Sequence, residues 1–192
     1  MIAFVDIAVT WLWVAFLALW FLAGLVSKRT VQVQSGGSRL LQSAFVFLGV
    51  ALMFNFHHWI TSGWLAVRLT PANAPVVLCG GALTLAGLLF CVWARVVLGR
   101  NWSSAVTIKQ DHQLVLRGPY RIVRHPIYTG LLIALLGTAM IIGVTRAFVG
   151  VLVIGLGFWL KSQTEEQFML HQFGAQYVDY RQRVHALIPF VL

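Results

Sequence analysis

Long uncharged stretches are the feature of this sequence that most restricts its fold. A helix needs about 20 apolar residues to cross a bilayer, and five stretches of roughly this kind cover more than half of the 192 residues. Only 10% of the residues are charged, against roughly 25% in soluble globular domains. The sequence therefore predicts an all-α integral membrane protein and excludes a soluble domain of ordinary size. The stretches are residues 7–27, 40–67, 69–94, 127–145 and 147–160.

Four of these stretches are long enough to span the membrane, whereas residues 147–160 are short. A helix of this length measures roughly 21 Å, less than the hydrocarbon core of roughly 30 Å. A helix that continues through residues 162–164, with the Lys161 ammonium reaching the surface, would complete the crossing. We therefore predict five transmembrane helices.

The basic residues predict the orientation. With five spans, 12 of the 14 Lys and Arg residues fall on one side, and only Arg68 and Arg146 fall on the other. Cytoplasmic loops carry the excess of Lys and Arg, so the N-terminus is expected outside and the C-terminus in the cytoplasm. The net charge of +9 then reflects topology, and we expect no nucleic-acid partner. The first stretch lacks a basic segment before it and a cleavage site, which favours a retained helix over a signal peptide.

Two cytoplasmic segments are large enough to carry chemistry: a connector over residues 99–126 and the tail from Lys161 onward. Within the connector, the sequence predicts for residues 99–117 only an irregular cytoplasmic segment that can contain short helices. In the tail, apolar and aromatic residues recur at helical spacing and predict an amphipathic C-terminal helix, which Gly174 weakens or splits. These residues are Met169, Phe173, Tyr177, Tyr180 and Val184.

The two glutamates of the chain, Glu165 and Glu166, directly follow the last stretch. Carboxylates at a membrane boundary are costly unless they are solvated or used. They either begin an exposed helix, where acids are favourable, or bind a cationic group or a substrate proton. No Cys and His spacing suits zinc, so we expect no metal.

The densest polar segment, residues 118–130, lies at the start of the fourth stretch and extends into it. Each of its residues taken alone fits a membrane-flanking role. Together, the arginines, His125, two tyrosines and a helix N-terminus suit an anionic group such as a carboxylate or phosphate.

The second half of the chain also carries short motifs in a fixed order. They are His112-Gln113-Leu114-Val115, Gly118-Pro119-Tyr120, Arg124-His125-Pro126 with Tyr128, Glu165-Glu166, Phe173-Gly174, Tyr177, Tyr180 and Ile188-Pro189. As a set, over about residues 99–190, these motifs resemble the isoprenylcysteine carboxyl methyltransferase family, and they are similar to the related phospholipid N-methyltransferases.

The resemblance implies an S-adenosylmethionine-dependent membrane methyltransferase whose cofactor pocket lies between the last two spans and their cytoplasmic flanks. It implies that Glu165 contacts the cofactor and that Lys161 replaces the family's substrate-anchoring arginine, which keeps the charge but loses the bidentate fork. The adenosine would be lined by His112, Gln113, Leu114 and Val115, and the methionine and ribose parts would be held by Tyr120, His125, Pro126, Ile127 and Tyr128.

The acceptor decides which residues are catalytic. A carboxylate is already ionised at neutral pH and needs only a cation, such as Lys161 or Arg124, to hold it. An amine must lose a proton, which Glu165 or Glu166 could accept. The preferred acceptor is an isoprenylcysteine-like carboxylate, with a phospholipid amine as the alternative. Two other classes stay open: an NAD(P)H-dependent membrane reductase of the sterol-reductase type, and a helper subunit without enzymatic activity.

The expected organisation is one domain with two parts. Residues 1–98 supply three transmembrane helices, and residues 99–192 form the methyltransferase-like region, with the connector, a helical hairpin and the C-terminal helix. We expect the protein in a cell inner membrane or the endoplasmic reticulum, with its active site facing the cytoplasm. The expected partners are the bilayer and a lipophilic or prenylated substrate.

Overall fold

The fold is a bundle of long helices with a small sheet at one end. A computed structural model describes residues 2–24, 30–33, 36–55, 58–99, 107–109 and 114–188. In chain order the elements are α1 (Ile2–Gly24), β1 (Thr30–Val33), α2 (Gly36–Phe54), the 3-10 helix η1 (Trp64–Ala66), α3 (Ala74–Leu98), β2 (Thr107–Lys109), the 3-10 helix η3 (Gly118–Arg121), α4 (Pro126–Ile142), α5 (Thr145–Phe173) and α6 (Ala175–Arg183).

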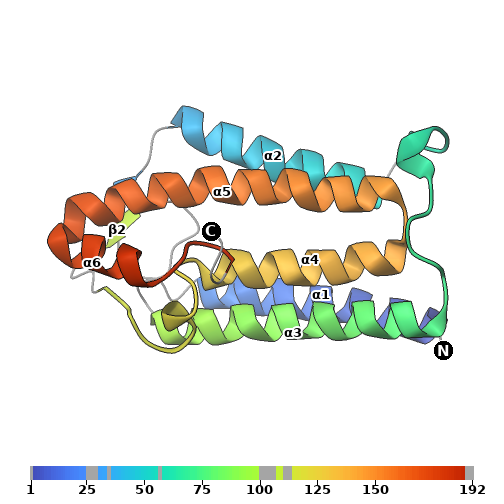
Figure 1. Ribbon diagram of the computed structural model, residues 1–192, viewed down its shortest axis with the longest axis horizontal. Helices are drawn as coiled ribbons and strands as arrows, with labels where there is room; N and C mark the ends of the chain where they lie inside the picture. The colour runs from blue at the N-terminus through green and yellow to red at the C-terminus, as the bar shows by residue number, and fades with distance from the viewer. Residues whose placement is uncertain are drawn as a thin grey trace.

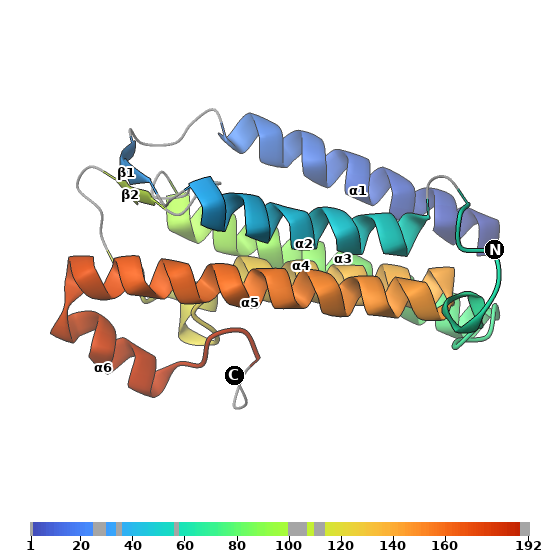
Figure 2. The same ribbon diagram turned by 90° about the horizontal axis from the view of Figure 1, so that it is seen from above.

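Helices α1 to α5 run side by side along the long axis of the molecule (Figures 1 and 2). Helix α4 packs along α3, and α5 packs along α2. Strands β1 and β2 pair in an antiparallel sheet, at the same end of the bundle as α6 (Figure 2). The predicted helical class is confirmed, with this sheet as an addition that the sequence did not suggest.

Within the described residues, four helices, α1, α2, α3 and α5, are long and apolar enough to cross a membrane, and α4 is a shorter apolar helix. The prediction that residues 127–145 form a helix long enough to span the membrane outright is not met, because α4 is shorter. The prediction that the helix over residues 147–160 continues through residues 162–164 is confirmed. Helix α4 has 17 residues, because Gly143 adopts a left-handed conformation with φ of 78° and caps it. Helix α5 has 29 residues and continues to Phe173.

The uncharged stretch over residues 40–67 is not one helix. Helix α2 ends at Phe54, and Asn55 follows with a positive φ of 47°. His58 also has a positive φ, of 53°. Asparagine and histidine tolerate this conformation better than most residues do. The chain therefore leaves the helix well before the apolar stretch ends at Val67.

The tail contains the end of α5 and a separate helix, because Gly174 breaks the predicted stripe with a φ of 51°. Helix α6 folds back beside α5 (Figures 1 and 2). Its residues Tyr177 and Tyr180 are buried, and the Tyr180 hydroxyl donates a 2.6 Å hydrogen bond to the Tyr120 carbonyl. The helix is thus docked onto the segment that contains η3.

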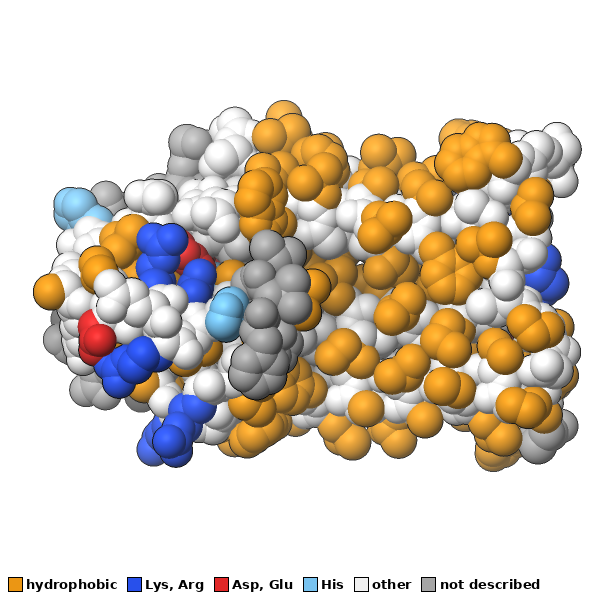
Figure 3. Space-filling view, in the orientation of Figure 1, with side chains coloured by type: hydrophobic (Ala, Val, Ile, Leu, Met, Phe, Trp, Pro, Cys, Tyr) orange, Lys and Arg blue, Asp and Glu red, His pale blue; other side chains and the backbone are white. Residues whose placement is uncertain are grey.

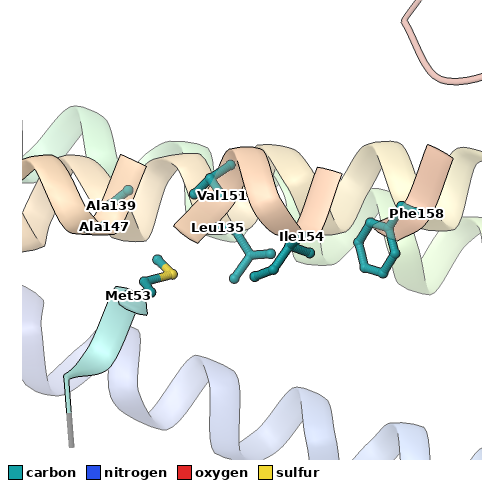
Figure 4. Packing of buried hydrophobic residues seen from close by; sticks show 7 residues of the cluster. All are labelled: Met53, Leu135, Ala139, Ala147, Val151, Ile154 and Phe158. Carbon is teal, nitrogen blue, oxygen red and sulfur yellow. The ribbon is translucent and has the colours of Figure 1, made fainter. Parts of the chain in front are cut away.

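A buried hydrophobic cluster joins α2, α4 and α5 (Figure 4). The backbones of α2 and α5 approach so closely that a Cβ at Gly150 would lie 2.5 Å from the Gly49 carbonyl oxygen, so a side chain there would push the helices apart. At one end of the cluster, the Phe158 ring stacks on Tyr128 with 4.9 Å between centroids. The core therefore leads directly to the candidate site. The cluster comprises Met53, Leu135, Ala139, Ala147, Val151, Ile154 and Phe158.

Candidate active site

The candidate site lies where α4 begins and α5 continues toward α6. His125 is the N-cap residue of α4, and Pro126 starts the helix, which is a position where the missing N–H of proline costs nothing. Helices α4 and α5 run side by side and are joined by a short turn at the opposite end of the bundle (Figure 1). The two helices therefore bring residues near their far ends together, and the Tyr128 hydroxyl reaches Glu165.

Glu165 is the carboxylate that a ligand can reach. The Tyr128 hydroxyl donates to Glu165 Oε1, and His125 Nδ1 lies 3.2 Å from Oε2. The Glu165 side chain nevertheless keeps 23% of its surface exposed. Lys161 Nζ lies 5.5 Å from the centre of the Tyr128 ring, a cation–π distance. This part of the site thus offers a carboxylate, a hydroxyl and an ammonium side by side.

Glu166 is enclosed by three cationic side chains and keeps only 2% of its side-chain surface exposed. Its Oε1 accepts hydrogen bonds from Arg124 Nε at 2.9 Å and Nη2 at 2.7 Å, and His125 Nε2 lies 3.3 Å away. Its Oε2 lies 3.1 Å from Arg181 Nε, but it accepts no hydrogen bond with good geometry among the described residues. Glu166 is therefore committed to holding other side chains.

His125 lies between the two carboxylates. Burial by itself would lower the pKa of its imidazole, but the hydrogen bonds and negative charges of Glu165 and Glu166 outweigh burial and raise that pKa above its ordinary value. Protonated His125 can donate from one ring nitrogen to each carboxylate. The Tyr128 ring stacks on the imidazole with 5.6 Å between centroids, so the orientation of His125 is fixed on its face and at both nitrogens.

Arg124 fastens the segment after α6 to the start of α4. Its Nη1 donates to the Val184 carbonyl and, at 3.3 Å, to the Arg181 carbonyl. The backbone N–H groups of Arg124 and His125 donate to the His185 and Ala186 carbonyls at 2.8 and 3.0 Å. All three guanidinium nitrogens of Arg124 therefore have protein partners.

The remaining predicted residues have different surroundings. Leu114 and Val115 line a pocket of about 500 Å³ together with the C-terminal end of α3, from Val96 to Gly99. Tyr120 is buried, and burial raises the pKa of its hydroxyl. Pro126 is fully buried, and the Ile127 carbonyl accepts a hydrogen bond from Cys91 Sγ at 3.3 Å. His112 and Gln113 lie outside the described residues.

Three residues that shape the site are not predicted from the sequence: Arg181, Tyr180 as a hydrogen-bond donor, and Phe158. Arg181 counts only as a topological charge in the sequence, because its contact with Glu166 follows from the reversal of direction at Gly174. A positive φ at a glycine is not encoded by any spacing. The sequence predicts binding of a cationic group by the glutamates as one of two alternatives, but not that Arg124 and Arg181 supply it.

The site combines both signs of charge. Glu165 can bind a cationic group or accept a proton, while Lys161 can hold an anion. The ion pairs around Glu166 keep His125 and the chain after α6 in place. Such an arrangement suits a ligand that carries an ammonium and a carboxylate on one small group.

Comparison with known proteins identifies relatives of one kind. Residues 75–176 match the phospholipid methyltransferase family. Protein-S-isoprenylcysteine O-methyltransferase B of Arabidopsis thaliana is 34% identical over 115 residues, which cover 58% of this chain and 58% of that protein. Protein-S-isoprenylcysteine O-methyltransferase of Schizosaccharomyces pombe is 38% identical over 104 residues, which cover 51% of this chain and 43% of that protein. The resemblance proposed from the motifs is confirmed.

A solved structure has a similar fold. The eukaryotic intramembrane Ras methyltransferase, isoprenylcysteine carboxyl methyltransferase, aligns with a TM-score of 0.57 at 23% identity, over 83% of this chain and 55% of that chain. The chain thus spans about half the length of the relatives it matches. The family match runs from α3 to the start of α6. It includes the two glutamates and Arg124, His125, Tyr128 and Lys161, but not Arg181. The chain belongs to the phospholipid methyltransferase family.

Proposed function

We propose that the protein is an S-adenosylmethionine-dependent membrane methyltransferase that acts on a lipidic acceptor, the carboxylate of an isoprenylcysteine-like substrate. One observation carries the proposal: Glu165 contacts His125 and Tyr128 and still keeps part of its side chain exposed. The curated relatives are named protein-S-isoprenylcysteine O-methyltransferases. Their names support this acceptor over others.

The proposed topology has five spans, α1 to α5, in which the shorter helix α4 also crosses the membrane. The N-terminus lies outside and the site faces the cytoplasm. In Figure 3, Lys and Arg side chains gather at the end that holds α6, and hydrophobic side chains cover the visible face of the bundle. A clustered positive end is typical of the cytoplasmic side. Residues 1–98 and 99–192 form one domain in this proposal, because α4 packs on α3 and α5 packs on α2.

The residues present fit S-adenosylmethionine. The methionine part carries an ammonium, which the partly exposed Glu165 carboxylate can bind. The pocket beside Leu114 and Val115 is lined by aliphatic residues and by Arg117, with more polar than apolar surface, and it falls in the size range of ligand pockets, roughly 300–1,000 Å³. We assign the adenosine to these two residues, with His112 and Gln113 as further candidates. When bound, the cofactor supplies an electrophilic methyl group.

The protein's own residues position the reactants. His125, Tyr128 and Glu165 hold the methionine part, with Tyr120, Pro126 and Ile127 shaping the backbone around it. Lys161 holds the acceptor carboxylate, which is ionised at neutral pH and needs no base. For Glu166 and Arg124, which the sequence suggested as catalytic, burial and mutual pairing support a positioning role through His125. Alignment of two reactants in a site without water can supply much of the rate enhancement.

A phospholipid amine is the second candidate acceptor, favoured by the match to the phospholipid methyltransferase family. With an amine, Glu165 would accept the proton that the acceptor must lose. A reductase has less support. The arginines Arg124 and Arg181 are engaged by Glu166, which leaves fewer cations for the phosphates of NADPH.

Thermal shifts test the cofactor, and methyl transfer tests the acceptor. Purified protein in detergent is heated with S-adenosylhomocysteine or with NADPH, as wild type and as Glu165→Gln and His125→Gln. A ligand that binds only the folded state raises the melting temperature. We expect S-adenosylhomocysteine to raise the melting temperature of the wild type clearly more than that of either variant. Labelled methyl transfer is then measured to a farnesylated cysteine derivative and to phosphatidylethanolamine.

Asp179→Asn is the matched control, because it removes a carboxylate from the exposed Arg183 pair on α6 and should keep the full shift. Stabilisation by NADPH alone would replace the methyltransferase with the reductase. Absence of a shift with either ligand would favour the helper subunit. Transfer to phosphatidylethanolamine but not to the farnesylated cysteine would change the acceptor and keep the cofactor.

A further inference from the structure

The connection between α2 and α3 is apolar, irregular and unexplained by methyl transfer. Its described part, residues 58–73, lies at the end of the bundle opposite α6 (Figures 1 and 2). Apart from His58, Arg68 is the one residue with an ionisable side chain in this segment. A water-exposed loop of this length ordinarily carries more polar and charged residues. We call residues 58–73 the α2–α3 connection.

The backbone of this connection is bonded to the turn between α4 and α5. The Leu69 and Thr70 N–H groups donate to the Gly143 carbonyl at 2.8 and 3.3 Å, and the Thr145 N–H donates to the Val67 carbonyl at 2.8 Å. The Thr70 hydroxyl donates to the Met140 carbonyl at 2.8 Å. These bonds satisfy groups at the end of α4 and in the turn that would otherwise need water.

The first half of the connection is closed by Asn55, which is buried. Its side-chain amide donates to the Ile60 carbonyl at 3.1 Å and accepts from the Ile60 N–H at 3.2 Å. The 3-10 helix η1 then bonds Ala66 and Val67 back to Gly63 and Trp64. Internal satisfaction of this kind is what a non-helical segment needs in order to enter the membrane.

The side chains point the other way, outward. Trp59 is 83% exposed and Trp64 is 66% exposed, and Val67 and Leu69 are more than half exposed. Helices α1 and α2 also carry many exposed apolar side chains. Tryptophan is enriched where the hydrocarbon meets the headgroups, because its ring is apolar and its N–H is polar.

We propose that the α2–α3 connection lies in the lipid bilayer, at the boundary between acyl chains and headgroups, with Trp59 and Trp64 inserted among the lipids. Helix α4, at 17 residues, measures about 25 Å, less than the hydrocarbon core of roughly 30 Å. The turn after it therefore lies near or below the boundary, and the connection shields its polar groups from lipid. Arg68, whose Nη1 donates to the Thr70 carbonyl at 3.2 Å, is positioned to contact a headgroup phosphate.

Site-directed fluorescence in lipid nanodiscs tests this depth, because both faces of the bilayer are open to water-soluble quenchers. The exposed native thiol is removed by Cys79→Ala, and single cysteines labelled with bimane are introduced as Trp59→Cys or Trp64→Cys. Two reference positions bracket the result. Leu17→Cys lies on the exposed face of α1, and Asp179→Cys is on exposed α6.

We expect lipids with a nitroxide near the headgroup to quench the probes at positions 59 and 64 more strongly than the probe at 17. Iodide should quench them several-fold less than the probe at 179. Iodide quenching equal to that at position 179, without quenching by lipid, would overturn the proposal in favour of a water-exposed loop. If both reagents quench the probes weakly, and quenching becomes strong only in nanodiscs that hold one copy each, the proposal would also be overturned, in favour of contact with a second copy. Neither outcome depends on methyltransferase activity.

Discussion

The two ends of the bundle are held together by different chemistry. At the α6 end, segments are joined by contacts between charged side chains: Glu166 binds Arg124, lies close to Arg181 and fixes His125. At the opposite end, the chain is held by hydrogen bonds to backbone carbonyls. The Gly143 and Val67 carbonyls accept from backbone N–H groups of neighbouring segments, and the Met53 carbonyl accepts from the Arg146 guanidinium.

The difference teaches what each end is suited to. A charged network responds to pH and ligands, and it is costly to bury unless every member is paired. Backbone bonds between a turn and a connection do not titrate, and they satisfy polar groups without water. The first kind suits a site that binds polar reactants, and the second suits a closed end in lipid. The predictions below test this contrast, beginning with the largest effect.

Removal of Glu166 should destabilise the α6 end most. In Glu166→Ala, the nearly buried Arg124 guanidinium loses its carboxylate, and breaking such a pair costs about 3–5 kcal/mol. The free energy of unfolding is measured by chemical denaturation in mild detergent. The control Asp179→Ala breaks the exposed pair with Arg183 and should cost less than about 1 kcal/mol. Equal costs for the two variants would contradict the contrast drawn here.

Replacement of the neighbouring carboxylate should instead affect ligand binding. Glu165→Gln keeps the size of the side chain but removes the charge, and a hydrogen bond to a charged group contributes about 1.5–3 kcal/mol. We expect the affinity for S-adenosylhomocysteine, measured by calorimetry, to fall by about tenfold or more. The loss of unfolding free energy should be smaller than in Glu166→Ala. The reverse order would exchange the roles assigned to the two glutamates.

At the opposite end, Gly143→Ala should lower stability without changing ligand affinity. Alanine in the left-handed conformation costs about 1–2 kcal/mol, and its Cβ would contact the Arg68 guanidinium and lie 3.1 Å from the Thr70 carbonyl oxygen. Gly155→Ala is the matched control, since its Cβ would meet only the Leu132 side chain at 3.5 Å. A decrease in affinity for Gly143→Ala would mean that the two ends are coupled.

The smallest effect should be a dependence on pH that only the α6 end produces. The pKa of His125 is raised in the folded protein, so its stabilising contribution is complete below the ordinary value of about 6.5 and is lost as pH rises through the raised pKa. The difference in melting temperature between wild type and His125→Gln should therefore shrink from acidic to alkaline pH. The same comparison for Gly143→Ala should stay constant, and a constant difference for His125→Gln would show that the histidine does not titrate in the fold.

The apolar helices and the composition of the site could be predicted from the sequence, because hydropathy and the order of the motifs depend on local residues. The contact between His125 and Glu165 could also be predicted, because both residues lie at similar distances from the turn between α4 and α5. The exact helix ends were not. Gly143, Gly174 and Asn55 stop helices through their backbone conformations, and many other glycines in the apolar stretches do not. Arg181 and the β1–β2 pairing depend on contacts between distant segments, for which one sequence holds no signal.

The length of helix α5 sets the distance between Glu165 and the opposite end of the bundle. The helix begins beside the closed end, and Glu165 follows 20 residues after Thr145, which at 1.5 Å per residue is about 30 Å, one hydrocarbon thickness. In the topology proposed above, the length of this continuous helix places the carboxylate at the plane where lipid gives way to water. In the proposed reaction, a polar donor from the cytoplasm and an apolar acceptor from the bilayer would meet at that plane. Membranes of different thickness should then change the reaction by moving the carboxylate out of that plane.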